Sequence, residues 1–273
     1  MRGPHNIWRL IRTGATLERT GAMGVVLNAF DAPAHLRLTA RILGWPFKWL
    51  GLKGDLNMPP APRALTALGP AYIKFGQVLS TRPDVVGNEL ASQLTVLQDK
   101  LPPFSTEIAK QNIAHELGVD ADVIFSAFSP AVAAASIAQV HRATLRQNGE
   151  EVAVKVLRPD IERAFRTDLD AFFLAARIIE VLSPASRRLR PLDVISHFES
   201  VVLGELDLRL ESSAASEFAA NTAQDEGFTL PVIKWPHSSR RVMTMSWAEG
   251  VPMGDNAAID AAGHNRQALS TRV

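Results

Sequence analysis

One lysine near the middle of the chain has the sequence surroundings of a phosphate ligand. Lys155 lies in the run 151–157, whose alternation places three valines on one face of a predicted strand and Lys155 on the other. The Asn148-Gly149 pair before this run favours a tight hairpin, and the small-residue stretch 133–136 (Ala-Ala-Ala-Ser) comes earlier. Short side chains let backbone N–H groups approach phosphates, which a strand lysine can then pair with. The alternative is an ordinary strand lysine that reaches solvent.

A phosphate-binding lysine also needs a carboxylate to hold it in place. The candidates are Glu205, Asp207 and Glu211, which cluster in a stretch predicted to be one long helix over residues 193–224. The alternative is a solvated acidic face, in which Glu205 and Arg209 form an exposed pair four residues apart.

The elements that would position these residues form an α+β pattern. Helices are predicted over a block at 64–118, in which Pro83 opens a helix bearing leucines 90, 94, 97 and 101, and Ser105 caps a helix that ends at Gly118. Further helices are predicted over 160–182 and 193–224. Strands are predicted over 125–130, 137–145, 151–157, 230–235 and 241–247. The order predicts a small antiparallel sheet behind a helical extension.

Composition excludes several classes of function. The chain has 29 Lys and Arg against 28 Asp and Glu, so no basic excess indicates a nucleic-acid partner. It has no cysteine, which excludes disulfides, thiolate metal sites and cysteine nucleophiles. No apolar run is long enough for a transmembrane helix, and no apolar core follows the N-terminal arginines as in a signal peptide.

Residues 36–50 combine bulky apolar groups, two tryptophans and several cations. Such a segment can lie in a membrane interface, with its aromatic rings at headgroup level and its cations toward anionic lipid. The alternative is a surface helix docked on the protein by its tryptophan face, since Pro46 shortens any continuous amphipathic helix.

Several motifs, in the same order, resemble the UbiB family of atypical kinases, which is linked to ubiquinone biosynthesis. They are Lys74-Phe-Gly76-Gln77, the alanine-rich loop 133–136 followed by 137–141 (Ile-Ala-Gln-Val-His), the strand lysine in 152–155 (Val-Ala-Val-Lys) with Arg158-Pro159, Glu205-Leu-Asp207, the helix residue Glu211, and a hinge-like stretch at 243–250. The resemblance extends to the N-terminal stretch 2–10 and spans nearly the whole chain.

The resemblance implies a protein-kinase-like N-lobe with a helical extension folded over its nucleotide cleft. We expect a basic, amphipathic segment at 1–56, the extension with its Lys-x-Gly-Gln motif at 57–118, the N-lobe at 119–250 and the start of a C-lobe at 251–273. The implied nucleotide-binding residues are Val132, Ala133, Ala134, Ala135, Ser136, Ile137, Ala138, Gln139, Val140, Lys155, Glu211 and Met245. The implied gate over the cleft brings Lys74, Gly76 and Gln77 against Glu205 and Asp207.

The expected cofactor is ATP, with magnesium expected for full-length members of the family. The expected partners are the nucleotide, membrane lipid or ubiquinone precursors, and other proteins of ubiquinone biosynthesis, at the cytoplasmic face of the inner membrane.

The family's catalytic His-x-Asp loop and metal-binding Asp-Phe-Gly do not occur in the sequence, so no catalytic or metal-binding residue is assigned. We therefore expect the N-terminal part of a longer protein, with most of the C-lobe missing and no turnover. The competing hypothesis is a non-catalytic nucleotide- or lipid-binding scaffold. The 2-polyprenylphenol 6-hydroxylase label used for some family members has no support in these residues.

Overall fold

The computed structural model describes residues 4–29, 34–98, 102–182, 187–188, 190–225 and 227–272. The predicted Leu101 and the start of the N-terminal motif, Arg2, lie outside these ranges. Helices fill the first part of the chain: α1 (Pro4–Thr20), α2 (Ala22–Ala29), α3 (Ala34–Gly44), η1 (Trp45–Leu50), α4 (Pro60–Leu68), α5 (Pro70–Ser80), α6 (Pro83–Leu94) and η2 (Thr95–Gln98).

Proline and glycine set the boundaries of these helices. Prolines stand in the first turn of α4, α5 and α6, where a missing N–H costs no hydrogen bond. Gly87 interrupts α6 with a φ of 78°, so the predicted leucine helix bends within its length. α7 (Thr106–Leu117) forms as predicted, because the Ser105 side chain accepts a bond from the N–H of Ile108 and Gly118 ends the helix at a φ of 71°.

The sheet has four antiparallel strands in the order β1-β2-β3-β4. They are β1 (Phe125–Ala134), β2 (Ala138–Leu145), β3 (Glu151–Leu157) and β4 (Val242–Ser246), and the short helix α8 (Ala121–Ile124) precedes β1. The predicted α+β class is confirmed, and β3 has the predicted bounds. The hairpin between β2 and β3 is closed by residues 146–149, with Gly149 at a φ of 71°.

Two predicted strands differ from the structure by more than one residue at an end. β1 runs past the predicted end at 130 through Ala134, with bulges that let it follow β2. The predicted strand 230–235 is wrong: these residues reach the sheet only through an isolated bridge between Ile233 and Met245, followed by η4 (Trp235–His237). Pro231 and Pro236 explain this, because proline has no N–H to donate to a strand ladder.

The long helix predicted over 193–224 is also wrong, because it is two helices. α10 (Pro191–Glu205) and α11 (Leu208–Asn221) meet at Leu206-Asp207. The Asp207 side chain accepts a bond from the N–H of Arg209 and so caps α11, and the N–H of Leu208 donates to Arg240 O at 2.9 Å. Before them comes α9 (Ile161–Leu182), and α12 (Asn256–Ala261) and α13 (Arg266–Arg272) follow β4.

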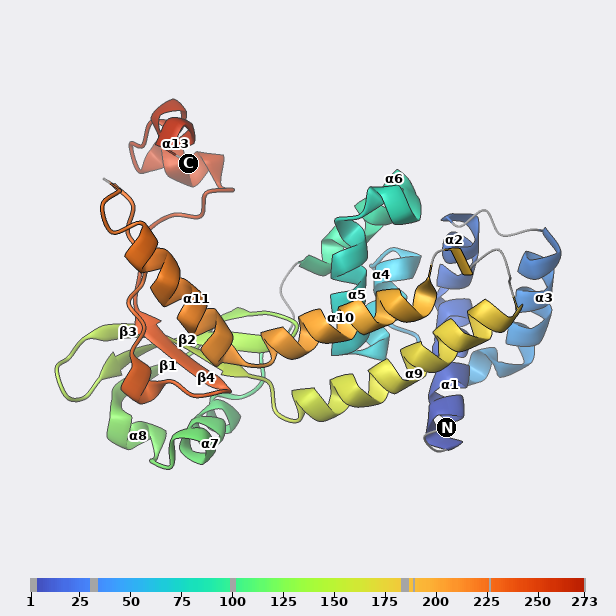
Figure 1. The fold of residues 1–273 in the computed structure, drawn as a ribbon, viewed down its shortest axis with the longest axis horizontal. Coiled ribbons are helices and arrows are strands. Elements are labelled where there is room, and N and C mark those ends of the chain that lie inside the picture. The colour runs from blue at the N-terminus through green and yellow to red at the C-terminus, as the bar shows by residue number, and fades with distance from the viewer. Residues whose placement is uncertain are drawn as a thin grey trace.

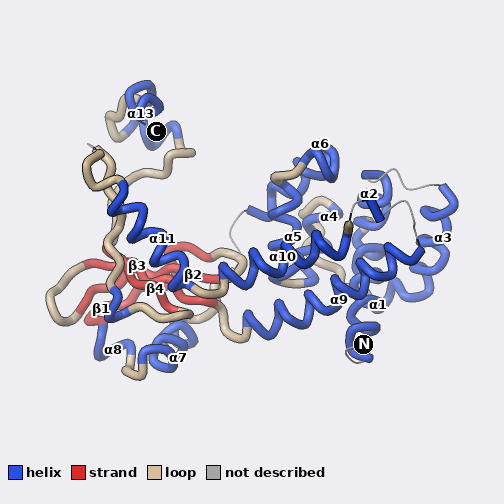
Figure 2. The backbone as a smooth tube through the Cα atoms, in the orientation of Figure 1, coloured by secondary structure: helices blue, strands red, loops and turns tan. Residues whose placement is uncertain are grey.

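Helices cover the two faces of the sheet differently. One face packs on α7 and α8 through a cluster that includes the valines of β3 and Ile113. The other contributes Ala138, Leu157 and Met243 to a cluster with the buried faces of α9 and α10. α9 and α10 lie side by side and run from the sheet to the N-terminal helices, where α9 packs on α1 and α5 (Figure 1). The strands thus gather at one end of the molecule and the N-terminal helices at the other (Figure 2).

The segment after β4 lies apart from this body, beyond α11 (Figure 1). Among the residues described, no helix combines the length and the apolar character that crossing a bilayer would need.

Candidate functional site

Lys155 forms the ion pair that the sequence suggested. Its Nζ lies 2.6 and 2.7 Å from the two carboxylate oxygens of Glu211, in the first turn of α11. The Lys155 side chain is 22% exposed and that of Glu211 47%, so the pair is open to a ligand from solvent. A strand lysine and a helix carboxylate are thereby brought together from positions that lie 56 residues apart.

The register of the sheet shows which predicted residues share the face of Lys155. Lys155 stands opposite Val140 on β2 and Met243 on β4, and Val140 in turn stands opposite Ala133 on β1. Met245, two residues from Met243, is on the same face. The structure therefore groups Ala133, Val140 and Met245 around Lys155.

The predicted alanine-rich loop is shorter in the structure. Ala133 and Ala134 are the last residues of β1, paired with Val140 and Gln139, so the loop itself is residues 135–137. The N–H of Ala135 donates to Ala138 O at 2.8 Å and closes the turn. Val132 and Ala133 are exposed and Ala134 partly so, whereas Ser136, Ile137 and Ala138 are buried.

Gln139 projects to the other face of the sheet. It is 1% exposed, its Oε1 accepts from the N–H of Phe104 at 2.9 Å, and its Nε2 donates to Phe104 O at 3.2 Å. Its Nε2 also lies 2.8 Å from His141 Nε2. The side chain of Gln139 is thus separated from Lys155 by the sheet.

The sequence analysis did not single out His141, although His141 lies on the same buried face of the sheet as Gln139. The ring is fully buried, and its Nδ1 lies 2.8 Å from Ser129 O. Burial lowers the pKa of His141, so the neutral ring donates to Ser129 and accepts from Gln139. This network fixes β1, β2 and the segment before α7 to one another.

The contacts predicted between the gate residues form in part. Lys74 on α5 forms an ion pair with Glu205 at 2.6 Å, at the end of α10. Gln77 instead donates to Leu97 O at 2.7 Å, within the extension. Asp207 pairs with Arg209 at 2.6 Å, and this hydrogen bond lowers the pKa of the Asp207 carboxyl. One of the two expected polar contacts therefore joins the extension to the α10–α11 bend.

Gly76 sets how closely α5 packs on its neighbours. A Cβ at this position would lie 2.4 Å from Leu97 Cδ1 and 2.6 Å from Leu65 Cδ1. A side chain at this position would press on these two leucines, which lie on η2 and α4, and α5 is the helix that carries Lys74.

The segment 36–50 does not dock by Trp49. Arg19 on α1 donates to Gly51 O at 2.6 Å and to Trp49 O at 3.2 Å, so the end of η1 is held by its backbone. The Trp49 side chain is 73% exposed. Docking by a tryptophan face is therefore wrong for Trp49, and the side chain of Trp45 lies outside the described residues.

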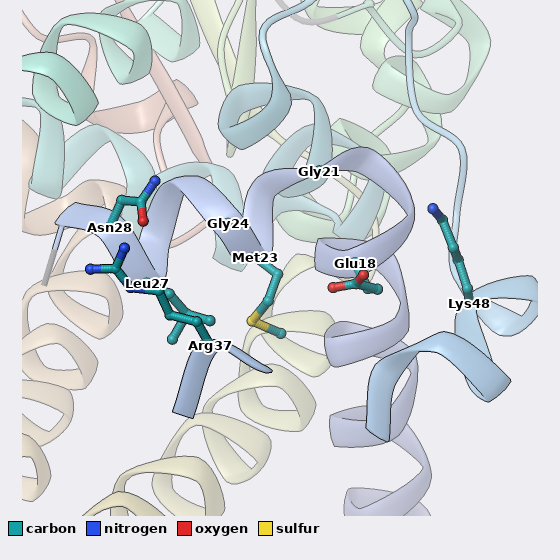
Figure 3. A pocket seen from close by; sticks show the side chains of 8 residues that line it. All are labelled: Glu18, Gly21, Met23, Gly24, Leu27, Asn28, Arg37 and Lys48. Carbon is teal, nitrogen blue, oxygen red and sulfur yellow. The ribbon is translucent and has the colours of Figure 1, made fainter. Parts of the chain in front are cut away.

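A cavity of about 370 Å³ opens beside this segment. It lies among α1, α2, α3 and η1, far from Lys155 in the chain's fold. Figure 3 shows Met23 and Glu18 between Arg37 at one end and Lys48 at the other. Sequence reasoning noted these cations but could not place them around one cavity, because their spacing depends on how three helices pack.

Comparison with known proteins identifies the family of this chain. Residues 96–273 match the ABC1 atypical kinase-like domain. The chain belongs to the ABC1 atypical kinase-like family. The match covers the sheet, α9, α10 and α11, and therefore both Lys155 and Glu211.

This chain is similar to several bacterial proteins called probable protein kinase UbiB. It is 39% identical to that of Aeromonas hydrophila over 271 residues, covering 98% of this chain and 49% of the relative. It is 39% identical to that of Shewanella loihica over 235 residues (85% and 43%) and 40% identical to that of Marinobacter nauticus over 237 residues (83% and 43%). The predicted membership of the UbiB family is confirmed, and the chain spans less than half the length of these relatives.

A solved structure, the complex of Rv3197 with erythromycin from Mycobacterium tuberculosis, is 30% identical in sequence to this chain. The two superpose with a TM-score of 0.49, covering 73% of this chain and 49% of the other.

Proposed function

We propose that this UbiB-family chain binds ATP on the sheet face that carries Lys155. The observation that supports this most directly is the Lys155–Glu211 pair, since a strand lysine held by a helix carboxylate is how kinase-like folds position the α- and β-phosphates. The small side chains of Ala133, Ala134 and Ala135 at the end of the β1–β2 hairpin fit a close approach of backbone to phosphate.

The remaining predicted residues have distinct parts in this proposal. The backbone N–H groups of Ser136 and Ile137 would face phosphate oxygens, since that of Ala135 already donates to Ala138 O. The apolar side chains of Val140 and Met245 would lie against the adenine ring. Gln139 would support the hairpin from the opposite face rather than touch the nucleotide. Magnesium would arrive with the phosphates and neutralise their charge.

Calorimetry with ATP and magnesium tests the proposal. Lys155→Met should weaken ATP binding by about 1–3 kcal/mol, as for loss of a charge-assisted contact. Lys110→Met is the matched control, because Lys110 also forms a lysine–carboxylate pair, with Asp122, but on α7. Unchanged ATP affinity in Lys155→Met, or no ATP binding by the wild type, would refute the proposal.

We also propose that the protein of which this chain is a part acts as a kinase or ATPase supporting ubiquinone biosynthesis, with lipid or ubiquinone precursors and other biosynthetic proteins as partners. Its support is the similarity to proteins called UbiB. The second candidate is a nucleotide- or lipid-binding scaffold without turnover.

A peripheral membrane contact, at the cytoplasmic face of the inner membrane, completes the proposal. Leu38, Ile42, Phe47 and Trp49 are each about half exposed or more, at 60%, 60%, 49% and 73%. Arg37, which directly precedes Leu38, and Lys48, between Phe47 and Trp49, line the neighbouring cavity. Exposed aromatic groups with adjacent cations suit the interface of an anionic bilayer.

Vesicle co-sedimentation tests this contact. Changing both Phe47 and Trp49 to serine should lower partitioning onto phosphatidylglycerol vesicles about ten-fold or more, since burying one large apolar side chain contributes about 1.5–3 kcal/mol. Phe218→Ser is the control, because Phe218 is 49% exposed on α11, away from this segment. Equal partitioning of the double variant and the wild type would refute the contact.

A further inference from the structure

The end of the β1–β2 hairpin is tied to residues 102–104, the segment that precedes α7. Arg158, just after β3, donates from Nε and Nη2 to Ala135 O at 3.1 and 3.0 Å. The same Nη2 donates to Pro102 O at 2.9 Å. The guanidinium also lies over the Phe104 ring, 5.8 Å from its centroid. One side chain thus joins the hairpin loop and residues 102–104.

The backbone around Arg158 is fixed as well. Its N–H donates to Ile137 O at 2.8 Å, and its carbonyl accepts from Arg241 Nη2 at 3.0 Å. Burial lowers the pKa of the Arg158 guanidinium, which nevertheless remains charged at any physiological pH. Both carbonyls that it binds therefore accept charge-assisted hydrogen bonds, the stronger kind.

We propose that Arg158 is a positioning residue for the nucleotide phosphates, holding the Ala135 carbonyl and so fixing the phosphate-facing loop. The inference rests on the proposed ATP site. A carbonyl oxygen that turned toward the phosphates would repel them, and a loop that rotates freely must lose conformational entropy when its N–H groups bind phosphate. The two bonds from Arg158 to Ala135 O remove both costs before the ligand arrives.

The contacts to residues 102–104 give this loop a second attachment. Gln139 holds both backbone groups of Phe104, and Arg158 holds the carbonyl of Pro102. This segment follows η2, whose Leu97 carbonyl accepts the bond from Gln77 of the Lys-x-Gly-Gln motif. The extension and the phosphate-facing loop therefore share Arg158 as a common support.

Hydrogen–deuterium exchange of the nucleotide-free chain tests the support directly. Arg158→Gln should speed exchange of amides in 134–138 and of those of Phe104 and Ser105 by about ten-fold, because a hydrogen bond to a charged group is lost. Arg146→Gln is the matched control. Arg146 likewise donates to two backbone carbonyls, Asp122 O at 2.9 Å and Phe125 O at 3.3 Å, but at the opposite end of β2. It should speed exchange near 122–126 only.

Calorimetry then tests the function of the support. Arg158→Gln should weaken ATP binding about ten-fold while leaving adenosine binding nearly unchanged, because only the phosphates meet the loop. Arg158→Lys should retain part of the ATP affinity, with a loss of about three-fold, since a lysine keeps the charge but lacks the planar fork. A merely structural role would lower ATP and adenosine binding equally.

Wild-type exchange rates at 134–138 in Arg158→Gln would overturn the proposal, as would equal losses for ATP and adenosine. If circular dichroism shows that the glutamine variant does not fold, Arg158→Lys decides, and wild-type exchange with wild-type ATP affinity overturns the proposal. A wild type that binds no nucleotide would refute the proposed ATP site. The exchange measurement would then still decide whether Arg158 holds the loop.

Discussion

Asp168 is a carboxylate buried in α9 whose cation comes from the first helix of the chain. It is 1% exposed, and Arg9 Nε donates to its Oδ1 at 2.6 Å. Burial raises the pKa of Asp168, and the nearby Arg9 charge opposes that rise. Next to it the Thr13 and Tyr72 hydroxyls lie 2.6 Å apart, and burial raises the pKa of Tyr72 to about 12.

This pair gives a pH-dependent prediction. Arg9→Leu should lower the free energy of unfolding by about 3 kcal/mol at pH 7, the lower end for breaking a buried pair, because Arg9 itself is partly exposed. A carboxyl with a raised pKa favours the folded state most when protonated, and that contribution falls as pH rises through the folded-state pKa. Without Arg9 the pKa rises further, so the loss should shrink as the pH is lowered and Asp168 becomes protonated.

Urea unfolding at several pH values checks this prediction. Arg82→Leu is the control, because the Arg82–Asp84 pair is exposed on both sides and its loss should leave the free energy of unfolding nearly unchanged. A loss for Arg9→Leu that is the same at low and neutral pH would show that the ionised carboxylate is not its cause.

The sheet face on which a residue lies was predictable where the local alternation of residue types settles it. Lys155 and the β3 valines occupy opposite faces as the sequence indicated. The same parity, carried across the hairpin, places Gln139 opposite Val156 and so on the valine face. That step needs the register between β2 and β3, which the loop 146–149 determines and which local pattern alone does not.

At the scale of elements, α5 is positioned by the absence of a side chain at Gly76. Gly76→Ala would press a methyl group against Leu65 and Leu97 in a packed helical cluster. We expect a loss of about 1–3 kcal/mol in the free energy of unfolding, the usual cost of overpacking. Where the two leucine side chains do not absorb the methyl group, α5 must shift and the Lys74–Glu205 distance should lengthen.

Gly14→Ala on α1 is the matched control for unfolding measurements. Nothing lies within 4 Å of a Cβ at Gly14, so the change should be neutral or should stabilise α1 by up to about 1 kcal/mol. The prediction for Gly76 would be wrong if both variants unfolded at the same urea concentration.

The bounds of some elements are set by the local sequence, and those of others by tertiary contacts. α7 and β3 follow from caps and alternation, so the sequence predicts their bounds. The break between α10 and α11 does not, because Leu206 and Leu208 are both fully buried and the N–H of Leu208 bonds to Arg240 O in a distant segment. Asp207 was available as a helix-start signal, but its place between two apolar residues resembled a continuing helix.

At the scale of the whole molecule, the chain presents a lysine–carboxylate pair without the acidic motifs that hold magnesium in kinase-like enzymes. No His-x-Asp loop and no Asp-Phe-Gly occurs in the sequence. Phosphoryl transfer requires stabilisation of transition-state charge by bound magnesium, which Lys155 alone cannot provide.

We therefore predict that this 273-residue chain hydrolyses ATP no faster than its Lys155→Met variant, even with magnesium and liposomes. Phosphate release, measured for both, checks this. A version extended by a kinase-like C-lobe is the positive control and should turn over. Equal turnover by the extended version and this chain would mean that catalytic groups lie within residues 1–273.

The bend between α10 and α11 also fixes the spacing between Glu205 and Glu211. Glu205 ends α10 and meets Lys74, while Glu211 lies one turn into α11 and meets Lys155. Each residue of an α-helix turns the chain by about 100°, so one inserted residue between Leu208 and Glu211 would swing the carboxylate away from Lys155. Every residue type in the motifs would survive such an insertion, yet the pair would be lost. The length of the interval between Glu205 and Glu211 is therefore as much a requirement of this site as the two acids themselves.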